Sequence, residues 1–153
     1  MRKLLLVITL ASGLHLAHAQ KSVYTELPGR LFSQGKEMFL NNNYVGCINT
    51  LQEFKNQSKD IKLMEEADYM IVSSLFYQGK AGDGTILKDF LDDYPESYHR
   101  NQISFFTGSI HFQQKDWNKA LHWFSQVDID YLSVSEQEDY SYRMAYASLQ
   151  KGD

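Results

Sequence analysis

Three of the five histidines, those outside the N-terminal residues 1–19, and a short acidic run are the side chains whose types could bind a metal ion. His111 and His122 lie in one segment of the chain, and His99 precedes them. A zinc site needs a third protein ligand with fixed geometry, and none accompanies these histidines at a suitable spacing. The acidic run lacks the spacing of a calcium-binding loop; its members are Asp89, Asp92, Asp93 and Glu96. We therefore expect solvent-facing side chains here, with no metal and no other cofactor.

The glycine-rich segment 79–84, with the sequence GKAGDG, is the next candidate for chemistry, because glycine-rich loops can bind phosphate. A phosphate loop places its lysine directly before Ser or Thr, after a strand. Here Lys80 precedes Ala81, and the surrounding pattern is helical. The segment therefore predicts a long turn between helices and no nucleotide site.

Cys47 is the only cysteine, so the chain has no internal disulfide. A single thiol in an exported protein can be reactive, or it can serve as a small buried hydrophobic residue. We favour burial, for a reason that the repeat pattern below supplies. No arrangement of Ser, His and Asp indicates nucleophilic catalysis, because no strand-to-helix elbow is predicted to present a nucleophile. We expect that the chain is not an enzyme.

The composition is that of an ordinary globular chain. Of the 153 residues, 43% are hydrophobic and 22% are charged, and this length suggests one domain. Only two prolines occur, which leaves most of the chain free to form helices. The formal net charge of -4 gives no basic surface for nucleic acid.

Residues 1–19 have the pattern of a secretory signal peptide. Arg2 and Lys3 precede an apolar run, and Ala17 and Ala19 supply the small residues that signal peptidase requires before Gln20. A membrane anchor is the alternative, but the apolar run is shorter than the about 20 residues that a span needs. We expect an exported protein, periplasmic or associated with the outer membrane, without a transmembrane span after cleavage.

Residues 101–127 form the clearest repeating unit. Apolar residues with helical spacing mark its first half, namely Ile103, Phe106 and Ile110. A second apolar face marks its second half, namely Trp117, Ala120, Leu121, Phe124 and Val127. A polar break lies between them, and its Asp116 can cap the second helix. The unit therefore predicts an antiparallel helix pair.

This unit resembles the tetratricopeptide repeat. The family has a small residue at repeat position 8, large residues at 11 and 12, an aromatic at 17, Ala at 20 and a large apolar residue at 24. These positions are filled by Gly108, His111, Phe112, Trp117, Ala120 and Phe124. The resemblance implies an all-α fold, a right-handed superhelical array of antiparallel helix pairs. It also implies that Gly108 and Ala120 face each other where the two helices cross.

The same pattern fits an upstream unit. Gly35 falls at position 8 and Leu51 at position 24, and Cys47 takes the place of the small Ala at position 20. This placement is why we interpret Cys47 as a packing residue. Met38, Phe39 and Tyr44 fill positions 11, 12 and 17. The polar residues 41–43 predict the turn, since Asn tolerates the left-handed backbone conformation.

Two further units are weaker. The middle unit has Ile71 at position 8, Leu87 at 24 and Pro95 at 32, but it puts Asp83 at the small-residue position 20, which suggests a local shift of register. A fourth unit places Ala145 at position 8. Successive position-8 residues are separated by 36, 37 and 37 residues. Residues 20–28 are then a short N-terminal segment, and residues 29–153 comprise about three and a half units.

Helix boundaries have local signals. We expect Asp60 to cap the third helix, and Ser135 with Glu138 to form a capping box for the last one. Pro95 should end a helix at Tyr94. The Tyr-Pro-Glu-Ser element that begins at Tyr94 resembles exported repeat proteins of bacterial cell envelopes, such as those of the barrel-assembly and Tol–Pal systems.

The family resemblance implies a concave groove lined by positions 2, 5, 9, 12 and 13. On the upstream unit these are Gly29, Phe32, Lys36, Phe39 and Leu40. On the best unit they are Gln102, Phe105, Ser109, Phe112 and Gln113. The last helix adds Asp139, Tyr142 and Tyr146. Aromatic rings mixed with amides suit an extended peptide or a partner helix. The alternative is that Phe105 and Phe112 only contact the neighbouring repeat.

We therefore expect a non-catalytic scaffold or adaptor of the cell envelope that binds a protein or peptide partner. The alternative is the recognition arm of a longer envelope enzyme or sensor, with its active module beyond residue 153. An independent small-molecule binder has no pocket signature in the sequence.

Overall fold

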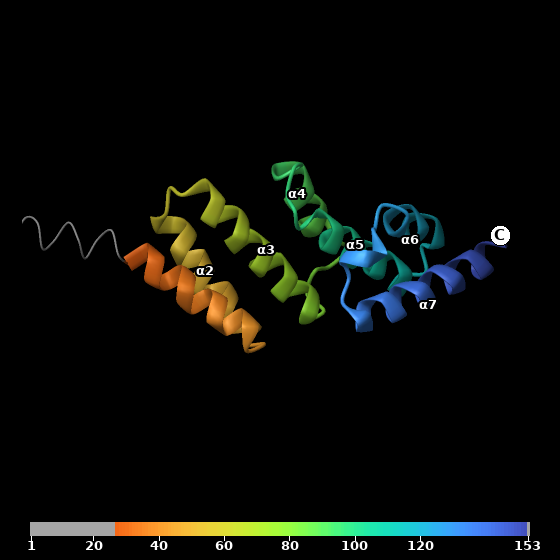
Figure 1. Ribbon diagram of the computed structural model, residues 1–153, viewed down its shortest axis with the longest axis horizontal. Helices are drawn as coiled ribbons and strands as arrows, with labels where there is room; N and C mark the ends of the chain where they lie inside the picture. The colour runs from red at the N-terminus through yellow and green to blue at the C-terminus, as the bar shows by residue number, and fades with distance from the viewer. Residues whose placement is uncertain (1–26, 153) are drawn as a thin grey trace, which may run out of the picture. The chain divides into compact units, whose positions relative to one another are not determined.

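The described part of the chain is entirely helical. The structure is a computed structural model and describes residues 27–152, so the predicted signal peptide lies outside the described residues. A first helix covers residues 27–40, and the rest of the fold follows in chain order (Figure 1): α2 (Tyr44–Gln57), α3 (Ile61–Tyr77), α4 (Thr85–Asp93), α5 (Arg100–Gln113), α6 (Trp117–Phe124), the 3-10 helix η1 (Ile129–Tyr131) and α7 (Val134–Lys151). The predicted all-α class is confirmed. The chain divides into two compact units after Ala67, and we describe each unit by itself.

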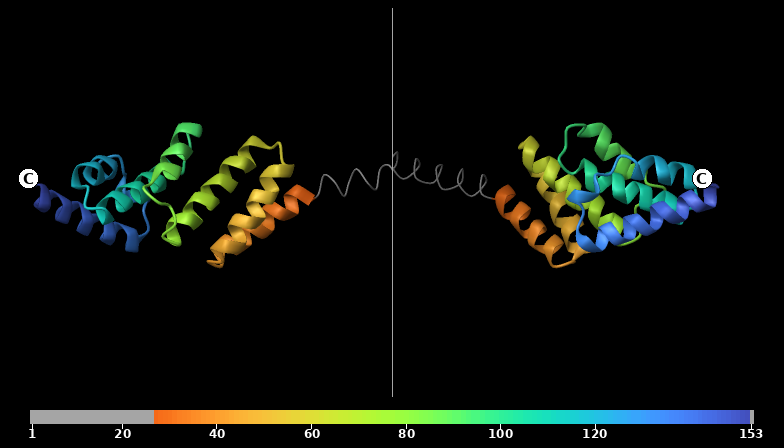
Figure 2. Two further views of the ribbon diagram at one scale, coloured as in Figure 1. Left: turned by 180° about the vertical axis from the view of Figure 1, so that it is seen from behind. Right: turned by 45° about the vertical axis from the view of Figure 1, so that its right-hand side comes forward.

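The first unit contains an antiparallel helix pair, helix 27–40 and α2, which lie side by side in Figures 1 and 2. The polar turn between them forms as predicted. Asn42 adopts a positive φ of 58°, and the Asn43 side chain caps α2 by accepting a hydrogen bond from the Gly46 amide at 3.1 Å. The short turn positions the two helices for close packing.

Large side chains of α2 pack against the small residue of helix 27–40. Cys47, Leu51 and Phe54 of α2 are fully buried, so the predicted packing position of Cys47 is confirmed. A Cβ atom on Gly35 would lie 2.5 Å from Cγ of Leu51, closer than real side chains approach. Phe32 also contacts Phe54, with ring centroids 5.3 Å apart. Glycine at position 35 therefore permits the close approach of the two helices.

The second unit is built around α5, which packs against α4 and α6, while α6 and α5 both pack against α7. Figure 2 shows α6 beside α7 from two further directions. The α5–α6 turn has the same form as the turn in the first unit. Lys115 has a positive φ of 60°, and the Asp116 carboxylate caps α6 by accepting from the Lys119 amide at 3.2 Å. The predicted helix pair and its cap are both confirmed.

The closest neighbour of Gly108 differs from the prediction. A Cβ atom on Gly108 would lie 2.5 Å from Cδ1 of Phe124, and its three nearest atoms all belong to the Phe124 ring rather than to Ala120. Ala120 is fully buried in the same core. The physical reason is size: the flat aromatic ring reaches over the glycine, so the small residue at position 8 accommodates the large residue at position 24.

The middle sequence repeat, which comprises α3 and α4, is irregular in its second helix. The predicted long turn is present, with Gly79, Gly82 and Gly84 at positive φ. Asp83 lies in this turn rather than at a helix crossing, and its carboxylate accepts from the Thr85 amide at 3.0 Å. This agrees with the local shift of register that the sequence suggested at Asp83, because α4 begins only at Thr85.

Helix ends follow the predicted signals with one exception. Asp60 caps α3 through the amides of Lys62 and Leu63 at 3.1 and 3.2 Å. The chain leaves helix α4 at Tyr94, before Pro95, as predicted, although α5 begins only at Arg100.

The exception is the capping box of α7, which is formed by Ser133 with Glu136 rather than by Ser135 with Glu138. The Ser133 amide donates to Glu136 Oε2 at 3.0 Å, and Ser133 Oγ accepts from the Glu136 amide at 3.4 Å. Both serines have an acidic residue three positions later. Leu132, which directly precedes Ser133, is buried, and its burial places the start of α7 at Ser133 rather than at Ser135.

Candidate functional site

The candidate site is an open pocket where the C-terminal end of α5 and the start of α6 meet α7. It has a cavity volume of about 330 Å³. Its lining combines four aromatic rings with amide and charged groups: Phe112, Gln113, Lys115, Trp117, Asp139, Tyr142, Arg143 and Tyr146. We refer to these eight residues as the aromatic pocket. Residues that the family pattern assigns to the groove contribute to it from both α5 and α7.

The aromatic rings of the pocket contact one another, edge to face in all the pairs below except Tyr142 with Tyr146, whose rings are tilted by 35°. The Phe112 centroid lies 5.5 Å from Trp117, and 5.7 Å from Tyr146. Trp117 and Tyr146 are 5.8 Å apart, and Tyr142 and Tyr146 are 5.9 Å apart. Such arrangements hold rings in fixed orientations. The side chains are nevertheless accessible, with Tyr142 61% and Tyr146 39% exposed.

Arg143 forms one side of the pocket and is held in three ways. Its guanidinium lies 5.4 Å from the centroid of Phe112, and its Nε donates to Asp139 Oδ1 at 2.8 Å. Its Nη1 also reaches the Ser109 carbonyl at 3.5 Å. The cation is therefore fixed against the aromatic ring, and Asp139 balances its charge locally.

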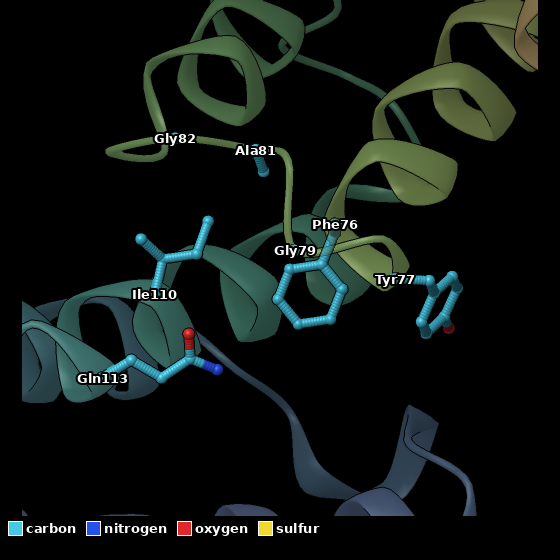
Figure 3. Close-up of a pocket in the computed structure, with 7 residues that line it drawn as sticks. All are labelled: Phe76, Tyr77, Gly79, Ala81, Gly82, Ile110 and Gln113. Carbon is cyan, nitrogen blue, oxygen red and sulfur yellow. The ribbon is translucent and has the colours of Figure 1, made fainter. Parts of the chain in front are cut away.

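A second pocket adjoins the first at Gln113, which lines both. It has a cavity volume of about 310 Å³ between the end of α3, the following turn and α5. Figure 3 shows Ile110 projecting from α5 toward the turn that carries Ala81 and Gly82. Tyr77 is 47% exposed at its edge. Gln113 thus lines two open pockets.

The structure brings together five of the predicted groove residues in the aromatic pocket: Phe112, Gln113, Asp139, Tyr142 and Tyr146. Phe105 and Ser109 are buried instead, with exposed fractions of 3% and 0%. The prediction that they line an accessible groove is wrong, because Phe105 packs with Phe106 and Phe124 in the core. Phe112 does contact the neighbouring helix, but it also lines the pocket.

The other predicted groove residues lie outside the pocket. Gln102 is half-buried and donates from Nε2 to Glu136 Oε1 at 2.5 Å, which joins α5 to α7. The residues of helix 27–40 belong to the first unit, where Phe32 and Phe39 are half-buried while Lys36 is exposed. Gly29 and Leu40 are exposed in the same helix.

Sequence reasoning missed three residues of the aromatic pocket, namely Lys115, Trp117 and Arg143. The repeat pattern assigned Trp117 to packing. Trp117 lies in the pocket because Asp116 starts α6 directly beside the end of α5. Arg143 could have been found from its spacing, since Asp139 precedes it by four residues on a helix. Lys115 had no signal beyond its place in the turn.

A third pocket, of about 440 Å³, is lined by two of the three histidines considered above as metal ligands. His111 and His122 line it with Asp83, Lys88 and Lys119 among others. In the described residues 27–152, no three His, Cys, Asp or Glu side chains are grouped so that they could hold a metal ion. Both lysines are paired, Lys88 with Asp92 at 2.6 Å and Lys119 with Asp116 at 2.9 Å. We therefore assign no function to this pocket.

The electrostatics near this third pocket are those of helix caps. The Lys119 ammonium and backbone amide, both bonded to the carboxylate, lower the pKa of Asp116. Hydrogen bonds from the Thr85 hydroxyl and amide lower the pKa of Asp83. Both carboxylates therefore serve local structure, as their positions at helix starts predict.

None of the helices between residues 27 and 152 combines the length with the apolar character that crossing a bilayer would take. Comparison with known proteins adds no assignment: no protein-family model, no curated protein and no solved structure matches the chain.

Proposed function

We propose that this chain is a non-catalytic interaction scaffold of the bacterial cell envelope, and that the aromatic pocket binds a peptide segment of a partner protein. The observation that carries the proposal is the set of accessible, mutually oriented rings around Phe112, Tyr142 and Tyr146. Exposed aromatic side chains gathered in one hollow are typical of protein-interaction sites.

The proposed architecture is an array of tetratricopeptide-like helix pairs. Its support is that two pairs, helix 27–40 with α2 and α5 with α6, have the same internal geometry. In each, a glycine accommodates a large residue of the second helix, Leu51 in one pair and Phe124 in the other. Each turn has one residue at positive φ followed by an Asn or Asp cap. Stacked pairs of this kind present extended binding surfaces.

The chemistry of the pocket suits a peptide better than a small polar metabolite. Ring faces bury apolar side chains at a low cost in conformational entropy, because each ring has only two rotatable bonds. Gln113, the tyrosine hydroxyls and Trp117 can donate or accept hydrogen bonds to a peptide backbone. The Arg143–Asp139 pair leaves Lys115 as the remaining charge of the lining, which favours a neutral or weakly acidic segment.

Phage-displayed random peptides panned against the purified chain test the proposal. Peptides that bind should be titrated against wild type and Tyr142→Ala while tryptophan fluorescence is followed, to which Trp117 of the pocket and Trp123 contribute. We expect the variant to weaken binding about fivefold or more, as the loss of an interface tyrosine costs above about 1 kcal/mol. Circular dichroism melts should remain close to wild type, because Tyr142 is mostly exposed.

Tyr131→Ala is the matched control. Tyr131 is 78% exposed in η1 and does not line the pocket, so its replacement should leave peptide affinity unchanged. If panning enriches no peptide, or if the enriched peptides bind Tyr142→Ala as tightly as wild type, the pocket is not the binding site.

Export of the protein is a separate part of the proposal and rests on the signal-peptide pattern of residues 1–19. Intact-mass measurement of the protein recovered from a bacterial periplasm should give a chain that begins at Gln20. A mature protein that retains Met1 would contradict the export proposal without affecting the peptide-binding proposal.

A further inference from the structure

The polar groups that the aromatic pocket leaves available to a ligand are mainly hydrogen-bond donors. In the part of the chain that the structure describes, the indole N–H of Trp117 and the ammonium of Lys115 form no hydrogen bond or ion pair. Both groups can only donate. The one carboxylate of the lining belongs to Asp139, and it already accepts from Arg143 at 2.8 Å. A ligand that supplies acceptors and few donors therefore complements this lining.

Two tyrosines extend the same surface along α7. Among residues 27–152, neither Tyr142 nor Tyr146 forms a hydrogen bond through its hydroxyl. The two rings lie one helical turn apart, with centroids separated by 5.9 Å, and both are exposed. The pair therefore offers two ring faces and two hydroxyl groups to a single segment of a ligand.

The second pocket continues this lining beyond Gln113. Its rings Phe76 and Tyr77 pack against Phe106, with centroids 4.0 and 5.4 Å from the Phe106 ring. Figure 3 shows the Gln113 side chain leaving α5 next to Ile110, with its amide on the side of Phe76. That amide forms no hydrogen bond within the described residues. Gln113 can therefore donate to a ligand that crosses from one pocket to the other.

A proline-rich segment matches this combination of rings and donors. Proline has a backbone carbonyl but no N–H, so such a segment presents many acceptors and few donors. It adopts the extended polyproline II helix, in which the backbone forms no internal hydrogen bonds and every third residue lies on the same side. Grooves lined by aromatic rings bind this helix at a low entropic cost, because the free segment is already extended.

Other peptide conformations fit the lining less well. A β-strand presents as many N–H groups as carbonyls and binds by pairing with the edge of a sheet, but residues 27–152 contain no strand. An α-helix bonds its own backbone groups, so it would leave the donors of Trp117, Lys115 and Gln113 without backbone acceptors. The polyproline II helix is the conformation whose carbonyls remain available to these donors.

We propose that the aromatic pocket and the second pocket together bind a proline-rich segment of the partner protein in the polyproline II conformation. The rings of both pockets pack against the proline rings, and the Gln113 amide donates to a backbone carbonyl between them. The unpaired ammonium of Lys115 favours a carboxylate beside the prolines. This inference rests on the proposed peptide-binding function and adds the chemical class of the ligand.

The peptides enriched by panning against the purified chain provide the first test. We expect them to contain prolines separated by two residues, as one side of a polyproline II helix requires, more often than the unselected library does. Replacing two such prolines by alanine in the tightest peptide should weaken its affinity about tenfold or more. The reason is that the alanine peptide loses more conformational freedom on binding.

Gln113→Glu tests the donor between the two pockets. The substitution keeps the size of the side chain but replaces the amide donor by an acceptor, so it should weaken binding of the proline peptide about fivefold or more. Gln114→Glu is the matched control. It adds the same charge one residue later, on a side chain that lines neither pocket, and should leave the affinity unchanged. Both glutamines are exposed, so melting curves of both variants should stay close to wild type.

Tyr77→Ala tests whether the second pocket takes part in binding. Tyr77 lines the second pocket and not the aromatic pocket, so its loss weakens binding only if the segment reaches both. We expect a loss of about fivefold or more, with circular dichroism as the check on folding. Unchanged affinity for a folded Tyr77→Ala variant would exclude the second pocket.

The outcomes separate this inference from the proposed function. Enriched peptides that lack proline, or that bind equally well with alanine in its place, overturn the proline-rich ligand. The same peptides still support the peptide-binding scaffold if Tyr142→Ala weakens their binding. Equal effects of Gln113→Glu and Gln114→Glu overturn the role of the Gln113 amide. If panning enriches no peptide, both the proposed function and this inference fail.

Discussion

Gly108 of α5 and Phe124 of α6 are in such close contact that a Cβ atom on the glycine would lie 2.5 Å from Cδ1 of the ring. The same relationship joins Gly35 to Leu51 in the first unit. In both pairs the large residue is fully buried. The contact therefore sets the distance between the two helices of each pair, and its consequences can be measured.

Gly108→Ala should lower the free energy of unfolding by about 1–3 kcal/mol, because the added methyl group must displace the buried Phe124 ring. This loss should occur although alanine is a better helix former than glycine by about 1 kcal/mol. Gly29→Ala is the control, since nothing lies within 4 Å of a Cβ at that position. Urea melts should show no loss of stability for Gly29→Ala. Equal effects of the two substitutions would contradict the packing role of Gly108.

Cys47 should react slowly with a thiol reagent in the folded protein and rapidly after unfolding in urea, because its side chain is fully buried. Cys47→Ala should be mild, whereas Cys47→Trp should overpack the helix pair and cost about 1–3 kcal/mol or more. The reaction of Ellman's reagent, followed by absorbance, gives the rates. Rapid labelling of the native protein would point to a reactive thiol instead.

Ser133→Ala should destabilise the protein by about 0.5–2 kcal/mol, because it removes the side chain that accepts from the Glu136 amide at the start of α7. Ser135→Ala should change stability by less than about 0.5 kcal/mol, since Ser135 is exposed and is not the cap. Thermal melts of the two variants compare these neighbouring serines directly. A larger loss for Ser135→Ala would restore the capping box first predicted from the sequence.

Asp116 should make the stability of the α5–α6 pair depend on acidity. In the folded state, the hydrogen bonds and charge of Lys119 lower the pKa of Asp116 below its ordinary value of 3.8. As the pH falls, Asp116 is therefore protonated in the unfolded state first. The contribution of the Asp116 carboxylate to the stability of the folded state is present above the ordinary carboxyl pKa. It is lost as the pH falls through that value and then through the lowered pKa.

Asp116→Asn keeps a capping oxygen but cannot titrate. The difference in stability between wild type and this variant should therefore shrink between about pH 6 and about pH 2. Added salt should reduce the difference at neutral pH, because the ion pair with Lys119 is solvent-exposed. A difference that stays constant with pH would show that the carboxylate charge has no role.

Much of the fold could be predicted from the sequence, because the helix pairs rest on local spacing. Gly35 with Leu51 and Gly108 with Phe124 have the same separation, and the caps Asp60 and Asp116 directly precede apolar helical patterns. The failures arose where tertiary packing decided between local alternatives. Ser133 and Ser135 both satisfy the capping-box pattern, and only the burial of Leu132 distinguishes them.

The candidate site was less predictable than the fold. Periodicity places Phe105 and Phe112 on the same face of one helix, two turns apart, but it does not show which of them the α6 and α7 side chains cover. The structure buries Phe105 and leaves Phe112 beside an open pocket. Arg143 joined the site through a contact with the Phe112 ring on another helix, and a pattern along one helix carries no information about such a contact.

The turns at Asn42 and Lys115 have a consequence for how the chain folds. Each brings a small residue and its large neighbour together across a short loop, so the entropic cost of closing each helix pair is small. Contacts between residues close in sequence form early, and proteins dominated by them fold in microseconds to milliseconds. Either pair can therefore act as a nucleus, and we expect the order of folding events to shift with mutations such as Gly108→Ala that weaken one pair alone.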